Sequence, residues 1–246
     1  MMATIAQHKK VEKIAVLIPA FCEEKTVGEI VSQARQYIND VILVDDASTD
    51  KTASVAEAAG ATVIRRKKNG GKGISLTEGF QYVLSREFDA VIALDADGFH
   101  DPREIPNFLE TYHRTHLPVL IGNRMANAGS VTLVRRWTIQ LMSYWLNRLF
   151  GVYVPDPPCG FRFYRCDVLP FLLEENSPLP AEFETLLNIA WRRIRVGPVR
   201  ISRFSNRHKS MISPFRDVVR FVRVLLKYYR RRKKSKRSVR LVREEL

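Results

Sequence analysis

Two aspartates separated by one residue are the strongest candidates for chemistry in this sequence. Asp95 and Asp97 flank Ala96 and directly follow residues 91–94, a short apolar run typical of a buried strand. Two carboxylates at the end of a strand can lean toward one hard cation, such as Mg²⁺ or Mn²⁺, that also holds a diphosphate. Such a pair is not specific on its own, because carboxylates at strand ends also cap helices or face water.

Three further apolar runs each precede a loop of unusual composition. The runs span residues 14–18, 41–44 and 62–64, and the loops after them contain PAFCEE, DDASTD and RRKKNGGKG. Short apolar runs that alternate with helical segments from residue 13 to residue 94 predict an α/β fold, with a mostly parallel, doubly wound sheet and flanking helices. All four loops should open at the carboxyl edge of this sheet, where ligands bind.

The polar loops offer groups that suit a nucleotide. Asp50 can cap the following helix, whereas Asp46 has no such local use and is placed to accept hydrogen bonds from a base or ribose, as is Glu23. Lys72, beside the glycines of NGGKG, can bring a cation and backbone N–H groups to a phosphate. The loop is not a Walker A sequence, because no Ser or Thr follows the lysine and the spacing differs.

Local sequence also predicts helix ends and one further helix. Thr26 and Glu29 form a T-x-x-E pattern that predicts a capping box for the first helix, and Gly60 predicts the C-terminal cap of the second. Residues 133–153 predict a helix that is rich in aromatic side chains and basic at its start. Packing in the core, packing against another subunit and a role for its arginines in a site all stay open.

Length and charge predict one domain with a basic tail. A chain of 246 residues can form a single α/β domain with an appended segment. The net charge of +14 is concentrated near the end, since residues 191–246 hold 20 Lys and Arg against 3 Asp and Glu. We therefore expect an N-terminal arm at residues 1–12, a catalytic domain at 13–213 and a basic tail at 214–246.

The tail predicts association with an anionic membrane surface. Over residues 215–230, apolar positions line one face of a helix, five Lys or Arg side chains line the other, and the run RRKKSKR follows. An amphipathic basic helix of this kind lies in the head-group region of a membrane. We expect no nucleic acid partner, because the carboxylates at the sheet edge would repel a phosphate backbone.

Cysteine usage and hydropathy indicate the compartment. Cys22, Cys159 and Cys166 are odd in number and form no CxxC pair, which favours reduced thiols. The first residues lack the apolar core of a signal peptide, and no run approaches the roughly 20 apolar residues of a transmembrane helix. We expect a cytoplasmic protein that is peripheral on the cytoplasmic face of a membrane.

Seven segments in a fixed order resemble one known family. They are VLIPAFCEE, VILVDDASTD, NGGKG, ALDADGFHDP, GNR, DPPCGFRFYR and RHKSMISPFRD. This set is similar to the polyprenol-phosphate sugar synthases of the dolichol-phosphate mannose synthase type, within the inverting family 2 glycosyltransferases with a GT-A fold. The resemblance covers about residues 13 to 220, and the ordered set is specific although each segment alone is not.

The resemblance implies a metal-dependent, inverting hexosyltransferase. It would move a mannose- or glucose-type hexose from a GDP- or UDP-hexose to a dolichyl or undecaprenyl type of polyprenyl phosphate. A lipid monophosphate, with a second pKa of about 6, is largely dianionic at neutral pH and needs no general base. The alternative is a family 2 enzyme that adds sugar to a glycan hydroxyl in cell-surface polysaccharide assembly, for which Glu182 and Glu184 are candidate bases.

The resemblance also implies roles for individual residues on the donor side. Asp95 and Asp97 would bind Mg²⁺ or Mn²⁺, with the Ala96 backbone near the diphosphate, and Arg124 would contact the donor phosphates. The residues that would hold the nucleoside are Pro19, Phe21, Glu23 and Asp46. A closing segment that contains Arg207 and Ser210 would cover the donor.

On the acceptor side, the resemblance assigns a loop that contains Asp156, Gly160, Phe161 and Arg162. Arg135 or Arg136, at the basic start of the predicted aromatic helix, would face the acceptor or donor phosphate. The residues closest to the chemistry would be Asp97, Arg124, Arg136, Asp156 and Arg162.

One position departs from the family pattern. Phe99 stands where the relatives often have a Gln that serves as an additional metal ligand. Since Phe cannot coordinate, the ion would rely on the two aspartates, the diphosphate and water. His100 is a weaker substitute, because adjacent residues point in different directions.

Overall fold

The structure, a computed structural model, describes residues 13–126, 133–173, 181–202 and 222, with the side chains of residues 181–184 excepted. Some of the predictions above lie outside the described residues. They concern the arm 1–12, the tail 214–246 apart from Val222, Arg207 and Ser210 of the closing segment, and the side chains of Glu182 and Glu184.

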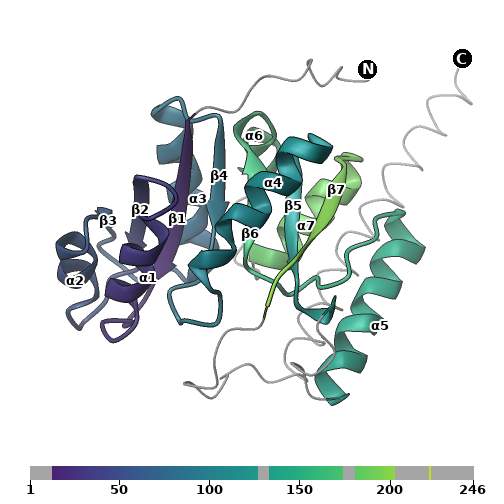
Figure 1. Cartoon of the computed structure of the whole chain (residues 1–246). Helices are drawn as coiled ribbons and strands as arrows, with labels where there is room; N and C mark the ends of the chain where they lie inside the picture. Colours follow the sequence, from purple (N-terminus) through teal and green to yellow (C-terminus); the bar gives the residue numbers. More distant parts are fainter. Residues whose placement is uncertain (1–12, 127–132, 174–180, 203–221, 223–246) are drawn as a thin grey trace, which may run out of the picture.

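A seven-stranded sheet runs through the molecule in the order β3-β2-β1-β4-β6-β5-β7 (Figure 1). β6 is antiparallel to both of its neighbours, and every other neighbouring pair is parallel. The strands are β1 (Ile14–Ala20), β2 (Asp40–Asp45), β3 (Thr62–Arg65), β4 (Ala90–Ala93), β5 (Val119–Asn123), β6 (Arg162–Arg165) and β7 (Val196–Arg200). The predicted mostly parallel sheet is confirmed, and the four strands expected from the sequence are β1 to β4.

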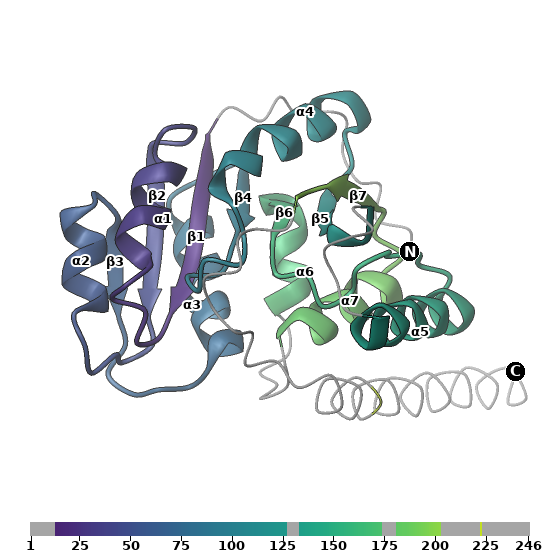
Figure 2. The same ribbon diagram turned by 60° about the horizontal axis from the view of Figure 1, so that its bottom comes forward.

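Helices cover both faces of the sheet (Figures 1 and 2). α1, α2 and α4 lie on one face, while α3 packs on β1 and β2 from the other, together with α6 and α7. The helices are α1 (Val27–Ala34), α2 (Thr52–Ala58), α3 (Lys72–Ser85), α4 (Ile105–Thr115), α5 (Leu133–Phe150), α6 (Leu169–Leu173) and α7 (Ala181–Trp191), with short 3-10 turns η1 (Pro102–Glu104), η2 (Arg124–Ala126) and η3 (Cys166–Val168).

The central strands are apolar because helices pack on both faces of the sheet. β1 and β4 lie in the middle of the sheet, and the apolar side chains of both strands are buried from Ala15 onward. A parallel sheet with helices on both faces needs apolar residues on both sides of each strand, which explains the continuous rather than alternating runs. The polar residues therefore begin where the strands end, at the carboxyl edge.

The predicted C-terminal cap of α2 at Gly60 is confirmed, whereas the predicted capping box at Thr26 is wrong. Gly60 has a positive φ of 94°, and its N–H donates to the carbonyl of Glu57 while the next N–H donates to Ala56, so α2 ends in a Schellman motif. Thr26 makes no side-chain capping bond at the start of α1. Its hydroxyl instead donates to the carbonyl of Ala96 at 2.7 Å, a long-range bond that the local pattern does not reveal.

The predicted aromatic helix is α5, which ends three residues earlier than expected. Gly151 has a φ of 70° and its N–H donates to the carbonyl of Asn147, which terminates the helix. One side of α5 is buried through Ile139, Met142 and Leu146, and the opposite side is exposed. None of the described helices is both long enough and apolar enough to span a membrane.

Candidate active site

The carboxyl edge of the sheet brings Asp95 together with residues from other segments. Asp95 follows β4 and forms an ion pair with the ammonium of Lys72, the first residue of α3. Its second carboxylate oxygen lies 3.7 Å from Nδ1 of His100. Burial alone would raise the pKa of Asp95, but the charge and hydrogen bond of Lys72, together with His100 and Arg124, lower that pKa to about 2. Asp95 is therefore an anion at physiological pH.

Asp97 lies on the turn that follows Asp95. Its carboxylate accepts a hydrogen bond from the N–H of Phe99 at 3.0 Å. Burial, followed by the negative charge of Asp95, raises the pKa of Asp97 to about 6. The two carboxylates thus share one edge and repel each other, which favours a cation bound between them.

The groups at this edge fit a divalent metal. Asp95 and Asp97 supply hard carboxylate oxygens of the kind that Mg²⁺ and Mn²⁺ prefer. Within the described part of the chain, no group of three or more His, Cys, Asp and Glu side chains could hold a metal by itself. The binding of a metal by the two aspartates together with a diphosphate and water stays a prediction.

The glycine loop before α3 is tied to Asp46. The Asp46 carboxylate accepts hydrogen bonds from the N–H groups of Gly70 at 3.0 Å and Gly71 at 2.7 Å, and it forms an ion pair with Arg66. Asp46 therefore has a long-range structural role that its local sequence does not reveal, because it holds the loop that delivers Lys72 to Asp95. Its contact with a nucleoside stays a prediction.

The loop after β1 is joined to the turn that carries Asp97. The N–H of Glu23 donates to the hydroxyl of Thr52 at 2.7 Å, and Thr26 donates to the carbonyl of Ala96, as described above. Phe21 is exposed at this edge, whereas Pro19 lies inside β1. The structure thus brings the predicted nucleoside-binding loop and the predicted metal-binding turn into direct contact.

Arg124 and Asp156, predicted on opposite sides of the reaction, bind one another. Nε of Arg124 lies 2.7 Å from Oδ2 of Asp156, and the terminal nitrogen lies 2.8 Å from Oδ1. Asp156 is completely buried. Burial opposes the charge of Arg124, but the charge and hydrogen bonds of Asp156, together with the negative charge of Asp95 and the contribution of Cys159, raise the pKa of Arg124 above its ordinary value. The pair therefore anchors the end of β5 to the loop that precedes β6.

Arg162 supports the same loop from inside. Its guanidinium is buried and donates to the carbonyls of Cys159 at 2.7 Å and Pro157 at 2.8 Å. In this structure Arg162 therefore holds the backbone of the predicted acceptor loop, and a direct contact with an acceptor phosphate stays a prediction.

Gly160 places this loop directly against Asp95. A Cβ atom at Gly160 would lie 2.7 Å from Oδ2 of Asp95 and 2.9 Å from Nζ of Lys72, distances that leave no room for a side chain. The predicted acceptor loop and the predicted metal-binding aspartate are thus in contact. Phe161 is fully buried and stacks on Phe108, which fixes the next residue of the loop in the core.

His100 and Cys159 are buried beside this cluster; sequence reasoning considered His100 only as a weak substitute metal ligand and gave Cys159 no role. Nδ1 of His100 accepts a hydrogen bond from the N–H of Asp95 at 3.4 Å, and Nε2 lies 3.9 Å from the sulfur of Cys159. Burial lowers the pKa of His100 to about 4 and raises the pKa of the Cys159 thiol to about 11. Both groups are neutral at pH 7. They therefore link Asp95 to the predicted acceptor loop without adding charge to the site.

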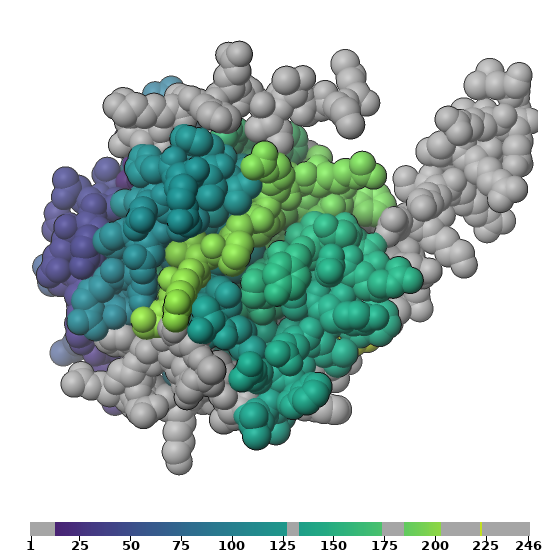
Figure 3. Space-filling model, turned by 45° about the vertical axis from the view of Figure 1, so that its right-hand side comes forward, coloured from purple at the N-terminus to yellow at the C-terminus, as the bar shows by residue number. Residues whose placement is uncertain are grey.

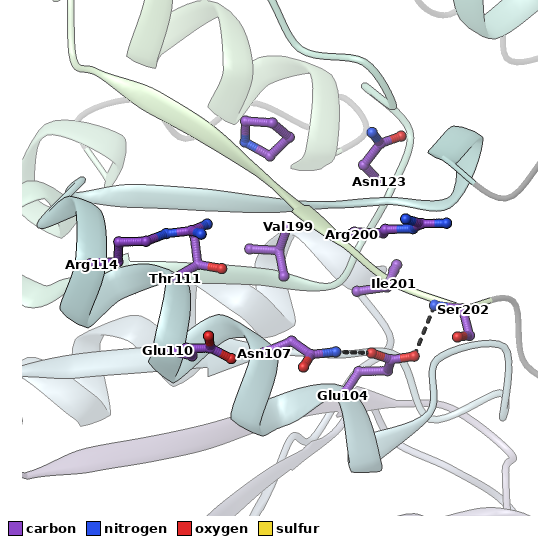
Figure 4. A pocket seen from close by; sticks show the side chains of 11 residues that line it. Glu104, Asn107, Glu110, Thr111, Arg114, Asn123, Val199, Arg200, Ile201 and Ser202 are labelled. Atoms are coloured by element: carbon purple, nitrogen blue, oxygen red, sulfur yellow. Dashed lines mark hydrogen bonds between the residues drawn. The ribbon is translucent and has the colours of Figure 1, made fainter.

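A groove between α4 and β7 is a separate feature (Figure 4). It measures about 620 Å³, and its polar lining includes Glu104, Arg114 and Arg200. The N–H of Ser202 donates to Glu104 at 2.8 Å across one end. Among the residues that the structure describes, none that was predicted to bind donor, metal or acceptor lines this groove. The candidate active site is the cluster around Asp95.

Comparison with known proteins identifies the relatives of this chain. The sequence profile of the family described as "Glycosyl transferase family 2" matches residues 15–172. The undecaprenyl-phosphate mannosyltransferase of Micrococcus luteus is 30% identical over 170 residues, which cover 64% of this chain and 68% of that protein. The polyprenol monophosphomannose synthase of Mycolicibacterium smegmatis is 28% identical over 206 residues, which cover 78% of this chain and 76% of that protein.

Solved structures confirm the predicted GT-A type of fold. The mannosyl-3-phosphoglycerate synthase from Rubrobacter xylanophilus superposes with a TM-score of 0.64 at 18% identity, over 91% of this chain and 74% of its own. The glucosyl-3-phosphoglycerate synthase from Mycobacterium tuberculosis, solved with Mn²⁺, UDP-glucose and phosphoglyceric acid, gives a TM-score of 0.63 at 18% identity, over 87% of this chain and 79% of its own. At these identities the likeness concerns the fold alone.

Proposed function

Because the chain belongs to glycosyl transferase family 2 and is a glycosyltransferase, we propose that it transfers a hexose from a GDP- or UDP-hexose to a polyprenyl phosphate at the cytoplasmic face of a membrane. The sugar is of the mannose or glucose type and is transferred with inversion. The reaction depends on Mg²⁺ or Mn²⁺ held by Asp95 and Asp97.

The main support for this proposal is the contact between Asp95, which precedes the turn that bears Asp97, and the loop after Asp156. Gly160 leaves no room for a side chain next to Asp95 and Lys72, so an acceptor held by this loop lies beside the group that holds the donor. The names of the relatives from Micrococcus luteus and Mycolicibacterium smegmatis support a polyprenyl phosphate as that acceptor.

The donor is bound at the carboxyl edge by groups from several loops. Glu23 and Asp46 accept hydrogen bonds from the nucleoside, and Phe21 offers an exposed ring to the base. Lys72 and Arg124 provide positive charge for the diphosphate. A bound divalent metal supplies electrostatic stabilisation of the negative charge that develops on the leaving nucleotide.

The acceptor phosphate needs no general base. As a dianion, it uses one oxygen to form a bond to the anomeric carbon, while the bond between that carbon and the diphosphate oxygen breaks and its electron pair leaves with the nucleotide. Attack from the face opposite the leaving group inverts the anomeric configuration. The loop around Gly160 and the arginines at the start of α5 orient the phosphate for this displacement.

Incubation with a panel of radiolabelled nucleotide sugars tests the proposal. The full chain is mixed with Mn²⁺, one labelled GDP- or UDP-hexose at a time, and either a polyprenyl phosphate or a soluble oligosaccharide, and the products are extracted into organic solvent. We expect one donor to label the organic phase only when polyprenyl phosphate is present. Label that appears only on the soluble oligosaccharide would favour a hydroxyl acceptor and overturn the proposal.

A further inference from the structure

One side of α5 lies at the molecular surface (Figure 3), and its exposed side chains form an apolar stripe. The stripe consists of Leu133, Val134, Trp137, Leu141, Tyr144 and Trp145. These positions recur at intervals of three and four residues, so they cover one face of the helix. Trp137 is 72% exposed and Tyr144 is 59% exposed, although aromatic side chains of this size are usually buried. A contiguous exposed patch of this kind marks an interaction surface.

The charges on α5 indicate what kind of surface the stripe contacts. The helix contains Arg135, Arg136 and Arg148 but no Asp or Glu. Trp and Tyr are the residues enriched where a membrane meets water, and arginine is attracted to anionic head groups. Pairing of the stripe with a second copy would bring arginines of both copies together on helices that hold no acid to neutralise them. The composition therefore favours a lipid surface over a second protein chain.

The position of α5 in the chain links the stripe to the site. The segment that contains α5 begins after Arg124 and returns at Asp156, and these two residues are ion-paired. The ion pair thus fixes both ends of the segment 124–156 beside the loop that contacts Asp95. The exposed stripe therefore lies on the segment that leads into the predicted acceptor loop.

We propose that the exposed face of α5 inserts into the head-group region of a membrane that contains anionic lipids. This inference rests on the proposed function, because it places the site at the surface from which a polyprenyl phosphate is drawn. Apolar burial of the stripe gives the contact a component that salt does not weaken, unlike the charge attraction expected of the tail.

The tryptophans of the chain report directly on this contact. There are three, of which Trp137 and Trp145 lie in the stripe and Trp191 lies at the end of α7. A Trp191→Phe variant of the full chain therefore carries reporters on α5 alone. Its emission is recorded with vesicles of phosphatidylcholine and phosphatidylglycerol, with and without brominated acyl chains, in 1 M salt. Neither polyprenyl phosphate nor nucleotide sugar is present.

We expect a blue shift of the emission and quenching by the brominated lipid. Tyr144→Glu in the same background should weaken vesicle binding by roughly ten-fold or more, because it removes apolar burial and adds a negative charge. Tyr37→Glu is the matched control, since Tyr37 is an aromatic residue that is 39% exposed just after α1. This control should behave like the parent.

Three results would overturn the inference. They are vesicle binding without any change in tryptophan emission, equal weakening by both Tyr→Glu substitutions, and a change from dimer to monomer in Tyr144→Glu without an effect on vesicles. Transfer to a short, water-soluble polyprenyl phosphate is measured alongside. Because Tyr144 lies outside the catalytic groups, Tyr144→Glu should keep this activity, and loss of the activity in the parent would contradict the proposed function and not the membrane contact.

Discussion

The guanidinium of Arg124 donates to both carboxylate oxygens of Asp156, and this pair fastens the end of β5 to the loop that approaches Asp95. One partner is completely buried and the other nearly so. Removal of either member takes away the opposite charge that offsets the burial of the other, which is costly for stability. The geometry of the loop therefore depends on a pair that sequence analysis assigned to two different substrates.

Asp156→Ala should lower the free energy of unfolding by about 3 to 5 kcal/mol, because the buried guanidinium of Arg124 loses the carboxylate that offsets its desolvation. Urea denaturation checks this value. The double variant Arg124→Leu, Asp156→Leu should recover part of the lost unfolding free energy. It should not transfer sugar, since Arg124 is also proposed to bind the donor phosphates. A double variant with near-normal turnover would show that the pair serves stability alone.

Gly160→Ala should reduce kcat/KM by about ten- to hundred-fold without unfolding the protein. The added methyl group would lie 2.7 Å from a carboxylate oxygen of Asp95, so the loop or the Asp95 and Lys72 side chains must shift. Small displacements of catalytic groups have effects of this size. Steady-state kinetics and thermal melting measure the two quantities. Unchanged kinetics would mean that the contact between the two segments is not needed for transfer.

Phe99→Gln should lower the metal concentration that gives half of the maximal activity. The side chain lies on the turn whose N–H binds Asp97, and an amide oxygen there adds a ligand that phenylalanine lacks. Titration of Mn²⁺ at fixed donor concentration gives this value for the parent and the variant. The same half-activating concentration in both would show that residue 99 does not limit metal binding.

Arg136→Ala and Arg162→Ala should both raise the requirement for lipid phosphate more than the requirement for donor, but for different reasons. Arg136 is proposed to contact the phosphate, so its loss should leave stability unchanged. Arg162 holds two loop carbonyls, so its loss should also cost roughly 2 to 4 kcal/mol of unfolding free energy. KM values for both substrates and denaturation curves separate the cases. Equal effects of each variant on both substrates would argue against the acceptor assignment.

The strands in the first half of the chain could be predicted from the sequence, because each central strand is an uninterrupted apolar run. β6 could not be predicted in the same way, since both Arg162 and Arg165 of this short strand are buried. Their burial depends on partners elsewhere, such as the carbonyl groups of the acceptor loop. A pattern of apolar residues cannot indicate a strand whose buried positions are charged.

The carboxylates of the site were predictable because they follow strands that share one edge. Their pairings were not, because each partner comes from a distant segment. Asp46 binds a loop 24 residues further along the chain, and Thr26 binds the carbonyl of Ala96 instead of capping its own helix. Local pattern identifies the groups that gather at the edge, whereas long-range contacts decide which of them hold the protein together.

Mass spectrometry of the extracted lipid tests directly whether the protein transfers a hexose to a lipid phosphate. The full chain is incubated with Mn²⁺ and the donor selected from the panel, together with either a polyprenyl phosphate or the corresponding unphosphorylated polyprenol. We predict that the polyprenyl phosphate gains one hexosyl unit, that the polyprenol gains none, and that Asp97→Asn abolishes the product. A hexosylated polyprenol, or an unmodified polyprenyl phosphate in the presence of every donor of the panel, would contradict transfer to a lipid phosphate.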